Sequence, residues 1–182
     1  MLKLVFAVFV GLVGAAVLHL IILLSTPHFS NRDAYTRSLA QGAPNLFHLL
    51  NENREKTSLS SGDPFMRVAV CTFDVAEKPT RLAAFGVVPF WSVSVFDSAS
   101  NEIFSMNDRT SAGGEMDILV ANQVQLAALR KAQPEGLSKS ILVEAGQSKG
   151  YAVLRTMVPQ PSFSEEATRF LSEAKCEQTQ WP

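Results

Sequence analysis

Histidine is scarce in this sequence, and most of the chain has none. The three histidines are His19, His28 and His48, and none occurs from Leu49 to Pro182. A serine or cysteine nucleophile is commonly activated by a neighbouring imidazole. The histidine-free part of the chain cannot form such a pair from its own residues, so we expect no catalytic residues of that kind.

Clusters of metal ligands and nucleotide-binding motifs are missing as well. The two cysteines, Cys71 and Cys176, lie far apart in the sequence. A zinc site would have to combine them with His48 and distant carboxylates, without the close ligand spacing that such sites usually have. No phosphate-binding loop, nucleophile elbow or dinucleotide fingerprint occurs. We therefore expect no metal and no cofactor.

Charge is sparse and balanced. Charged residues make up 18% of the 182 residues, and the formal net charge is −1. Nucleic acids attract proteins that carry an excess of basic charge, so we expect no nucleic-acid partner here. The length suits one domain with additional segments rather than two full domains.

The longest uncharged run lies near the N-terminus. From Leu4 to Leu24 no residue is charged, and His19 is the only polar side chain. A helix of this length spans roughly 30 Å, the thickness of a bilayer's hydrocarbon core. A cleavable signal peptide is the alternative, but its apolar region is usually about 7–15 residues and ends in a small-residue cleavage pattern. The longer run, without that pattern after it, predicts a transmembrane signal anchor over residues 1–25 that crosses the membrane once.

The charges that flank this helix do not decide its orientation. Lys3 precedes it, whereas Arg32 and Arg37 follow it and are partly offset by Asp33. Positive charge normally stays in the cytoplasm, so the local count is close to neutral or unfavourable for export. Short N-terminal segments of this type usually remain inside and send the rest across. We therefore expect the C-terminal domain to lie outside the cytoplasm.

One side of the predicted anchor carries small residues. Ala7, Gly11, Ala15 and His19 follow one another at four-residue intervals. Small residues at this spacing allow close approach of a second helix, and a histidine inside a membrane usually faces protein or water. The alternative is that alanine and glycine are simply common in such helices and that a neutral histidine is tolerated. Our hypothesis is a helix-contact face for a partner membrane protein.

The rest of the chain divides into two parts. Residues 26–64 are expected to form a juxtamembrane region with short helices over 34–41 and 45–51 and a polar linker up to residue 64. Residues 65–182 are expected to form a β-rich domain. Within it we predict strands over 66–75, 81–85, 90–96, 102–106, 116–120, 140–144 and 151–157, and helices over 122–131 and 164–174. These elements predict a mainly β fold with a few helices, arranged as a β-sandwich.

Three segments together resemble a known family. They are Asp74-Val75-Ala76-Glu77-Lys78-Pro79, residues 90–97 with the sequence FWSVSVFD, and residues 150–156 with the sequence GYAVLRT. Their order and spacing resemble the bacterial domain of unknown function 1254, over roughly residues 63–178. The resemblance implies a jelly-roll-like sandwich and an envelope or exported location, but no reaction and no catalytic residues. Together with the predicted anchor, it leads us to expect a single-pass protein of a bacterial inner membrane with its C-terminal domain in the periplasm. We expect no counterpart of the second domain of the longer members within these 182 residues.

The cysteines are expected to pair. Cys71 lies within a predicted strand and Cys176 follows the last predicted helix. Disulfides form in oxidising compartments such as the periplasm. The alternative is two separate thiols.

The remaining candidates lie around one predicted hairpin. Asp97, Glu102 and Asp108 could supply the paired acids of a hydrolase that acts on an envelope glycan or lipid, or could be ordinary turn residues. Asn107, Asp108 and Arg109 could line a binding cleft, and Trp91 is either a core residue or a ligand-stacking residue.

We therefore expect a membrane-anchored envelope protein that acts by binding or assembly and is not an enzyme. The alternatives are a carboxylate-dependent hydrolase and a sandwich that binds a lipid or another small ligand in an apolar cavity.

Overall fold

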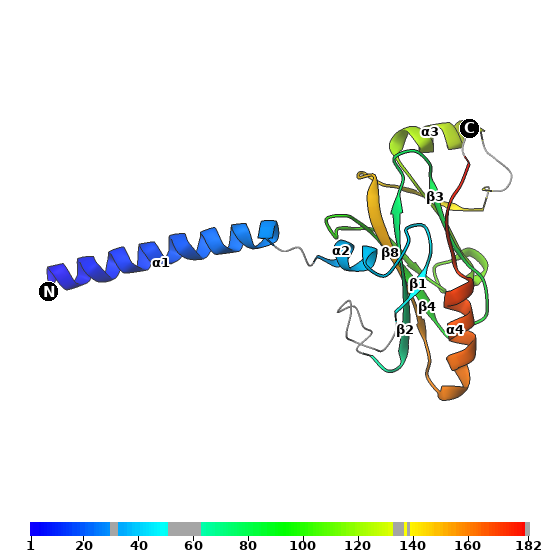
Figure 1. The fold of residues 1–182 in the computed structure, drawn as a ribbon, viewed down its shortest axis with the longest axis horizontal. Helices are drawn as coiled ribbons and strands as arrows, with labels where there is room; N and C mark the ends of the chain where they lie inside the picture. The colour runs from blue at the N-terminus through cyan, green and yellow to red at the C-terminus, as the bar shows by residue number, and fades with distance from the viewer. Residues whose placement is uncertain (30–32, 51–62, 133–136, 138, 181–182) are drawn as a thin grey trace. The chain divides into compact units, whose positions relative to one another are not determined.

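The computed structural model describes residues 1–29, 33–50, 63–132, 137 and 139–180, and it contains two compact units. The first unit, Met1–Asp33, consists of the helix α1 (Leu2–Phe29). Its apolar stretch Leu2–Ser25 is long enough to cross a membrane, a criterion that a signal sequence near the N-terminus would also satisfy. The second unit, Ala34–Pro182, holds all the strands of the described residues (Figure 1).

Two β-sheets form the second unit within the described part of the chain. The five-stranded sheet has the order β1 (His48–Leu49), β2 (Met66–Asp74), β8 (Lys149–Met157), β4 (Trp91–Asp97), β5 (Glu102–Asn107), with every neighbour antiparallel. The four-stranded sheet has the order β7 (Ile141–Glu144), β6 (Met116–Ala121), β3 (Thr80–Ala84), β9 (Lys175–Gln178). The strands β6 and β7 are parallel, and the crossover connection that such a pair requires contains the helix α3 (Gln123–Ala132).

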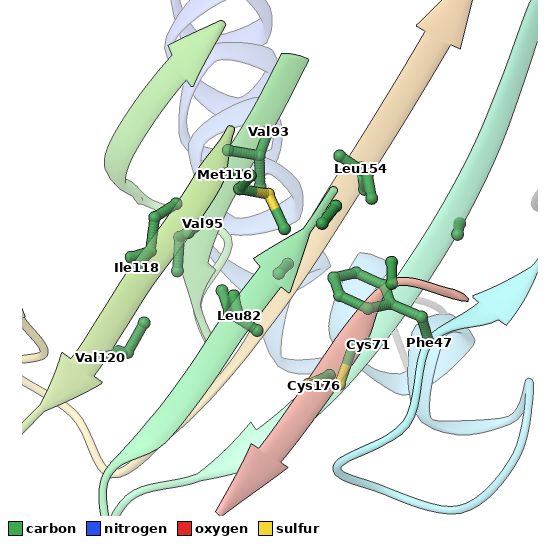
Figure 2. Packing of buried hydrophobic residues seen from close by; sticks show 14 of the residues in the cluster. Phe47, Cys71, Leu82, Val93, Val95, Met116, Ile118, Val120, Leu154 and Cys176 are labelled. Carbon is green, nitrogen blue, oxygen red and sulfur yellow. A yellow bond between two sulfur atoms is a disulfide. The ribbon is translucent and has the colours of Figure 1, made fainter. Parts of the chain in front are cut away.

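The core lies between the two sheets, as expected for a β-sandwich. Along β4, residues Trp91, Val93 and Val95 are buried and alternate with partly exposed neighbours, because successive side chains in a strand point to opposite faces. Residues of the four-stranded sheet belong to the same buried cluster, among them Leu82 and Ile118 (Figure 2). The structure therefore confirms the β-sandwich that the period-two pattern of the sequence predicted.

A disulfide bond joins the sheets through this core. Cys71 of β2 is bonded to Cys176 of β9, with 105 residues of sequence separation and a Cα–Cα distance of 6.5 Å (Figure 2). Both residues are buried, at 0% and 2% exposure. The expected pairing is confirmed, and it fixes the last strand of the four-stranded sheet to the five-stranded sheet.

Helices cover other parts of the sandwich. The helix α4 (Ser164–Glu173) follows a 3-10 turn, η3 (Pro161–Phe163), and buries Ala167, Phe170 and Leu171. A second 3-10 turn, η1 (Ala112–Gly114), precedes β6. The helix α3 buries Leu126 and Leu129 in a smaller cluster with residues of β6. The helix α2 (Ala34–Leu39) contacts β2 and β8.

The prediction of a helix over 45–51 was wrong. His48 and Leu49 form β1 instead, which pairs with Val70 and Ala69 of β2. Backbone amides of Asn45 and Leu50 donate to carbonyls of β2, so this segment supplies hydrogen-bond partners for the backbone of β2. Tertiary pairing therefore outweighed the local pattern. The strand β9 was not predicted, and the linker expected up to residue 64 lies largely outside the described residues.

Removing the disulfide should destabilise the second unit. We expect the double variant Cys71→Ala, Cys176→Ala to lose about 2–5 kcal/mol of unfolding free energy, because the bond closes a long loop in the unfolded chain. Urea unfolding in a mild detergent, followed by tryptophan fluorescence, would measure the change. Reductant should lower the midpoint of the wild-type chain and leave that of the double variant unchanged. Equal midpoints for both chains in the absence of reductant would contradict this account.

Candidate functional site

The loop that follows β5 is a hydrogen-bonded turn. The Asn107 side-chain oxygen accepts the backbone N–H groups of Arg109 and Thr110 at 3.0 and 3.1 Å. The backbone N–H of Asp108 donates to the carbonyl of Trp91 at 3.2 Å, and one carboxylate oxygen of Asp108 is buried with no hydrogen-bond partner. Arg109 is exposed. Asn107, Asp108 and Arg109 thus lie together, and their role in binding remains a prediction.

Trp91 lies at the start of β4 and points into the core. Its side chain is 1% exposed, and its indole Nε1–H donates to the carbonyl of Gly114 at 2.9 Å. A buried tryptophan normally needs such a partner for its N–H. The geometry fits the core interpretation of this residue.

The three acids of the predicted hairpin are not collected at one place. Asp97 ends β4, whereas Asp108 is hydrogen-bonded to Trp91 at its beginning. Six residues of extended strand separate these positions by roughly 20 Å. Glu102 pairs with Phe96, near the Asp97 end, and is exposed.

Asp97 itself organises the turn between β4 and β5. Its carboxylate accepts the backbone N–H groups of Ala99 and Asn101 at 2.9 and 2.8 Å, and the Asn101 side-chain amide at 2.8 Å. Burial opposes ionisation of this carboxylate, but the hydrogen bonds from Asn101 and Ala99 outweigh it and lower the pKa of Asp97. A general acid in glycoside hydrolysis needs a raised pKa. The lowered pKa of Asp97 therefore does not suit a general acid.

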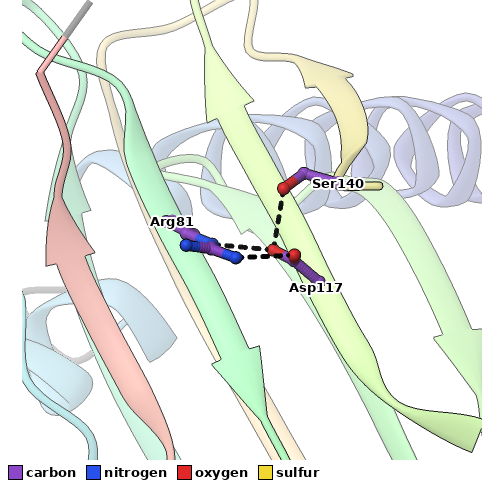
Figure 3. A network of polar contacts seen from close by, with 3 residues as sticks. All are labelled: Arg81, Asp117 and Ser140. Atoms are coloured by element: carbon purple, nitrogen blue, oxygen red, sulfur yellow. Dashed lines mark hydrogen bonds and ion pairs between the residues drawn. The ribbon is translucent and has the colours of Figure 1, made fainter. Parts of the chain in front are cut away.

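On the four-stranded sheet, Arg81 and Asp117 form an ion pair within the fold. The Arg81 guanidinium donates to both carboxylate oxygens of Asp117 at 2.9 and 2.8 Å, and the Ser140 hydroxyl donates to the same carboxylate at 2.9 Å (Figure 3). The two charged side chains are 29% and 17% exposed. The hydrogen bond with Asp117 raises the pKa of Arg81. This network joins β3, β6 and the residue before β7, and leaves Arg81 with a carboxylate partner.

The outer surface of the five-stranded sheet gathers polar side chains that sequence reasoning did not group. Strand pairing places Arg155 of β8 beside Ser92 of β4, and Ser92 beside Asn107 of β5. The next row contains Val153, Ser94 and Ser105. Their burial pattern alternates with the core residues of the same strands, so all six lie on the outer face. We call this set the outer polar face. Its signal in the sequence was the alternation of serines with apolar residues in β4, but the pairing of strands was needed to assemble it.

The small residues of the predicted anchor lie along one helix. Ala7, Gly11, Ala15 and His19 all lie on α1 and are exposed in this unit taken by itself, so their contact with a partner helix remains a prediction. In the described ranges, no group of three or more histidine, cysteine, aspartate or glutamate residues could hold a metal ion.

Comparison with known proteins shows similarity of fold. No protein-family model matches the chain, and no curated protein matches it. The VPA0106 protein from Vibrio parahaemolyticus has a solved structure with a TM-score of 0.57 at 12% identity, covering 79% of this chain and 34% of that one. An uncharacterised protein from Burkholderia cenocepacia gives a TM-score of 0.49 at 10% identity, covering 78% of this chain and 37% of that one. The chain thus spans about a third of each, and membership of the resembled family remains a prediction.

The role of Asp97 can be tested by its pH dependence. Because its pKa is lowered on folding, the carboxylate stabilises the folded chain above its unfolded pKa of about 3.9, and this contribution is lost as pH falls through the folded pKa. We expect Asp97→Ala to be less stable at pH 7 and to lose less stability than wild type on acidification. Urea midpoints between pH 7 and pH 3 would measure this. Glu102→Gln, on the same hairpin, should follow the wild-type profile, and a parallel decline for Asp97→Ala would contradict the assignment.

Proposed function

We propose that this chain is a single-pass inner-membrane protein of a bacterium, with its β-sandwich in the periplasm, and that it acts by binding or assembly rather than by catalysis. The observation that carries the proposal is the buried Cys71–Cys176 bond in a chain that also has an apolar N-terminal helix. Disulfides persist in the bacterial periplasm and are rare in the cytosol. A helix of this length and composition suits a bilayer.

The polar groups of the domain support binding over catalysis. The Asp97 carboxylate accepts hydrogen bonds within a turn, and the Asp117 carboxylate accepts hydrogen bonds from Arg81 and Ser140. The carboxylate-hydrolase alternative rested on Asp97, Glu102 and Asp108, which the fold distributes over the two ends of β4. The alternative of a ligand held between the sheets has less support, because buried side chains such as Leu82, Val93 and Met116 occupy the region where a cavity would lie (Figure 2).

The membrane placement can be tested with reporters. A reporter that becomes active only after export, fused behind Pro182, should be active, and one that is active only in the cytoplasm should be silent. The protein should stay with the membrane after carbonate extraction. A variant whose residues 1–25 are replaced by a cleavable signal peptide should be exported but released. An active cytoplasmic reporter on the wild-type chain would overturn the proposed orientation.

The proposed contact face of α1 can be tested separately. If a partner helix approaches the small residues, Gly11→Leu with His19→Leu should abolish or strongly reduce crosslinked complexes in membranes. Val13→Leu with Val17→Leu is the matched control, because these positions lie on the opposite side of the helix and should leave the complexes unchanged. Quantifying crosslinked species at equal protein level gives the answer. Unchanged complexes in the first variant would remove the contact face.

A further inference from the structure

The outer polar face is one part of the outer surface of the five-stranded sheet, and the helix α2 covers another part. The helix α2 lies against β2 and β8, and Tyr35 approaches Tyr151, with ring centroids 6.5 Å apart. Tyr151 stacks on Phe96 of β4 at 5.0 Å. This chain of three rings borders the part of the sheet formed by β4, β5 and the outward side chains of β8. Of that part, Ser105 is exposed and the other five members are partly exposed.

Arg155 is the cation of this face, and its environment differs from those of Arg81 and Arg169. Arg81 has the carboxylate of Asp117 and Arg169 has that of Glu165. Within the described residues, the polar contact of Arg155 is the Ser94 hydroxyl at 3.4 Å, and it has no carboxylate within ion-pair distance. A partly buried guanidinium with only a weak neutral partner can donate several further hydrogen bonds to an anion.

The neighbours of Arg155 offer hydrogen bonds suited to hydroxylated ligands. Ser92, Ser94 and Ser105 carry hydroxyl groups that both donate and accept, and Asn107 retains an amide N–H₂ group because its oxygen serves the turn. Val153 is the one apolar member of the set. Glu102 shares this side of β5 but lies at the Phe96 end, two rows from Arg155.

We propose that the outer polar face binds an acidic glycan, meaning a saccharide segment whose sugars carry carboxylate or phosphate groups. Arg155 binds the anionic group, and the serine hydroxyls with the Asn107 amide bind sugar hydroxyls. The partly exposed ring of Phe96 lies at the border, where a sugar ring can pack against it. An acyl chain fits less well, because the members other than Val153 are polar and offer little apolar area. The row of hydroxyl groups beside Arg155 favours a saccharide over an acidic peptide, because a saccharide presents a hydroxyl on most of its ring carbons.

This inference deepens the proposed binding function, and its test does not depend on where the domain lies in the cell. The full chain, purified in a polyoxyethylene detergent that carries no sugar headgroup, is titrated calorimetrically with four probes. These are tetragalacturonate, phosphorylated maltotetraose, neutral maltotetraose and tetraglutamate. We expect saturable binding of one or both acidic saccharides, with binding of maltotetraose and tetraglutamate at least about tenfold weaker. The two acidic saccharides distinguish carboxylate from phosphate recognition.

The variants locate the site. Arg155→Gln should weaken acidic-saccharide binding at least about tenfold, because a charge-assisted contact is lost. Arg169→Gln, which removes an exposed arginine on α4, is the matched control and should bind like wild type. Should Arg155→Gln fail to fold, Ser105→Glu places a repelling charge at an exposed position and should weaken binding in the same way. Absence of saturable binding by acidic saccharides, equal affinity of the folded face variant and the control, or tetraglutamate binding as tight as the saccharides would overturn the proposal. A chain that binds these saccharides while its export reporter is silent would instead overturn the periplasmic placement.

Discussion

The alternation of side chains along the central strands determines both faces of the five-stranded sheet. Inward residues such as Val93 and Leu154 are completely buried in the sandwich. The residues between them must then point outward, whatever their side-chain chemistry. Because a shift of one residue in strand pairing would exchange the two faces, the apolar core also fixes Arg155 and Ser92 as outward neighbours. The core and the outer polar face are therefore specified by one register.

Two arginines on the two sheets show how pairing limits function. Arg81 is held by both oxygens of Asp117, so its charge is satisfied within the fold and serves cohesion between β3 and β6. Arg155 sits among hydroxyl and amide groups, and its contact with Ser94 is long. A charge that the fold leaves with neutral neighbours contributes little to stability and retains capacity for a ligand.

Sequence patterns predicted the sandwich well because burial imposes a period of two on each strand. The strand at Trp91–Asp97, the hairpin to β5 and the Cys71–Cys176 pair were all anticipated. The segment around His48 was misassigned because its leucines suit a helix, whereas the open edge of β2 required backbone partners. The outer polar face could not be derived, since β8 and β4 are far apart in sequence and only their register brings Arg155 next to Ser92. Pairing between distant strands carries information that local periodicity lacks.

The position of Cys176 has a consequence for how the domain is made. Its strand, β9, pairs with β3, and its sulfur bonds to Cys71 of β2. Two strands from early in the chain therefore reach their final contacts only when one of the last strands has formed. During synthesis from the N-terminus, β3 lacks its neighbour and Cys71 remains a thiol until almost the whole domain has emerged. Contacts of such high sequence separation slow folding and expose unpaired edges in the meantime. We therefore expect the newly made chain to need chaperones that protect the free thiol and the unpaired strand edge until β9 is synthesised.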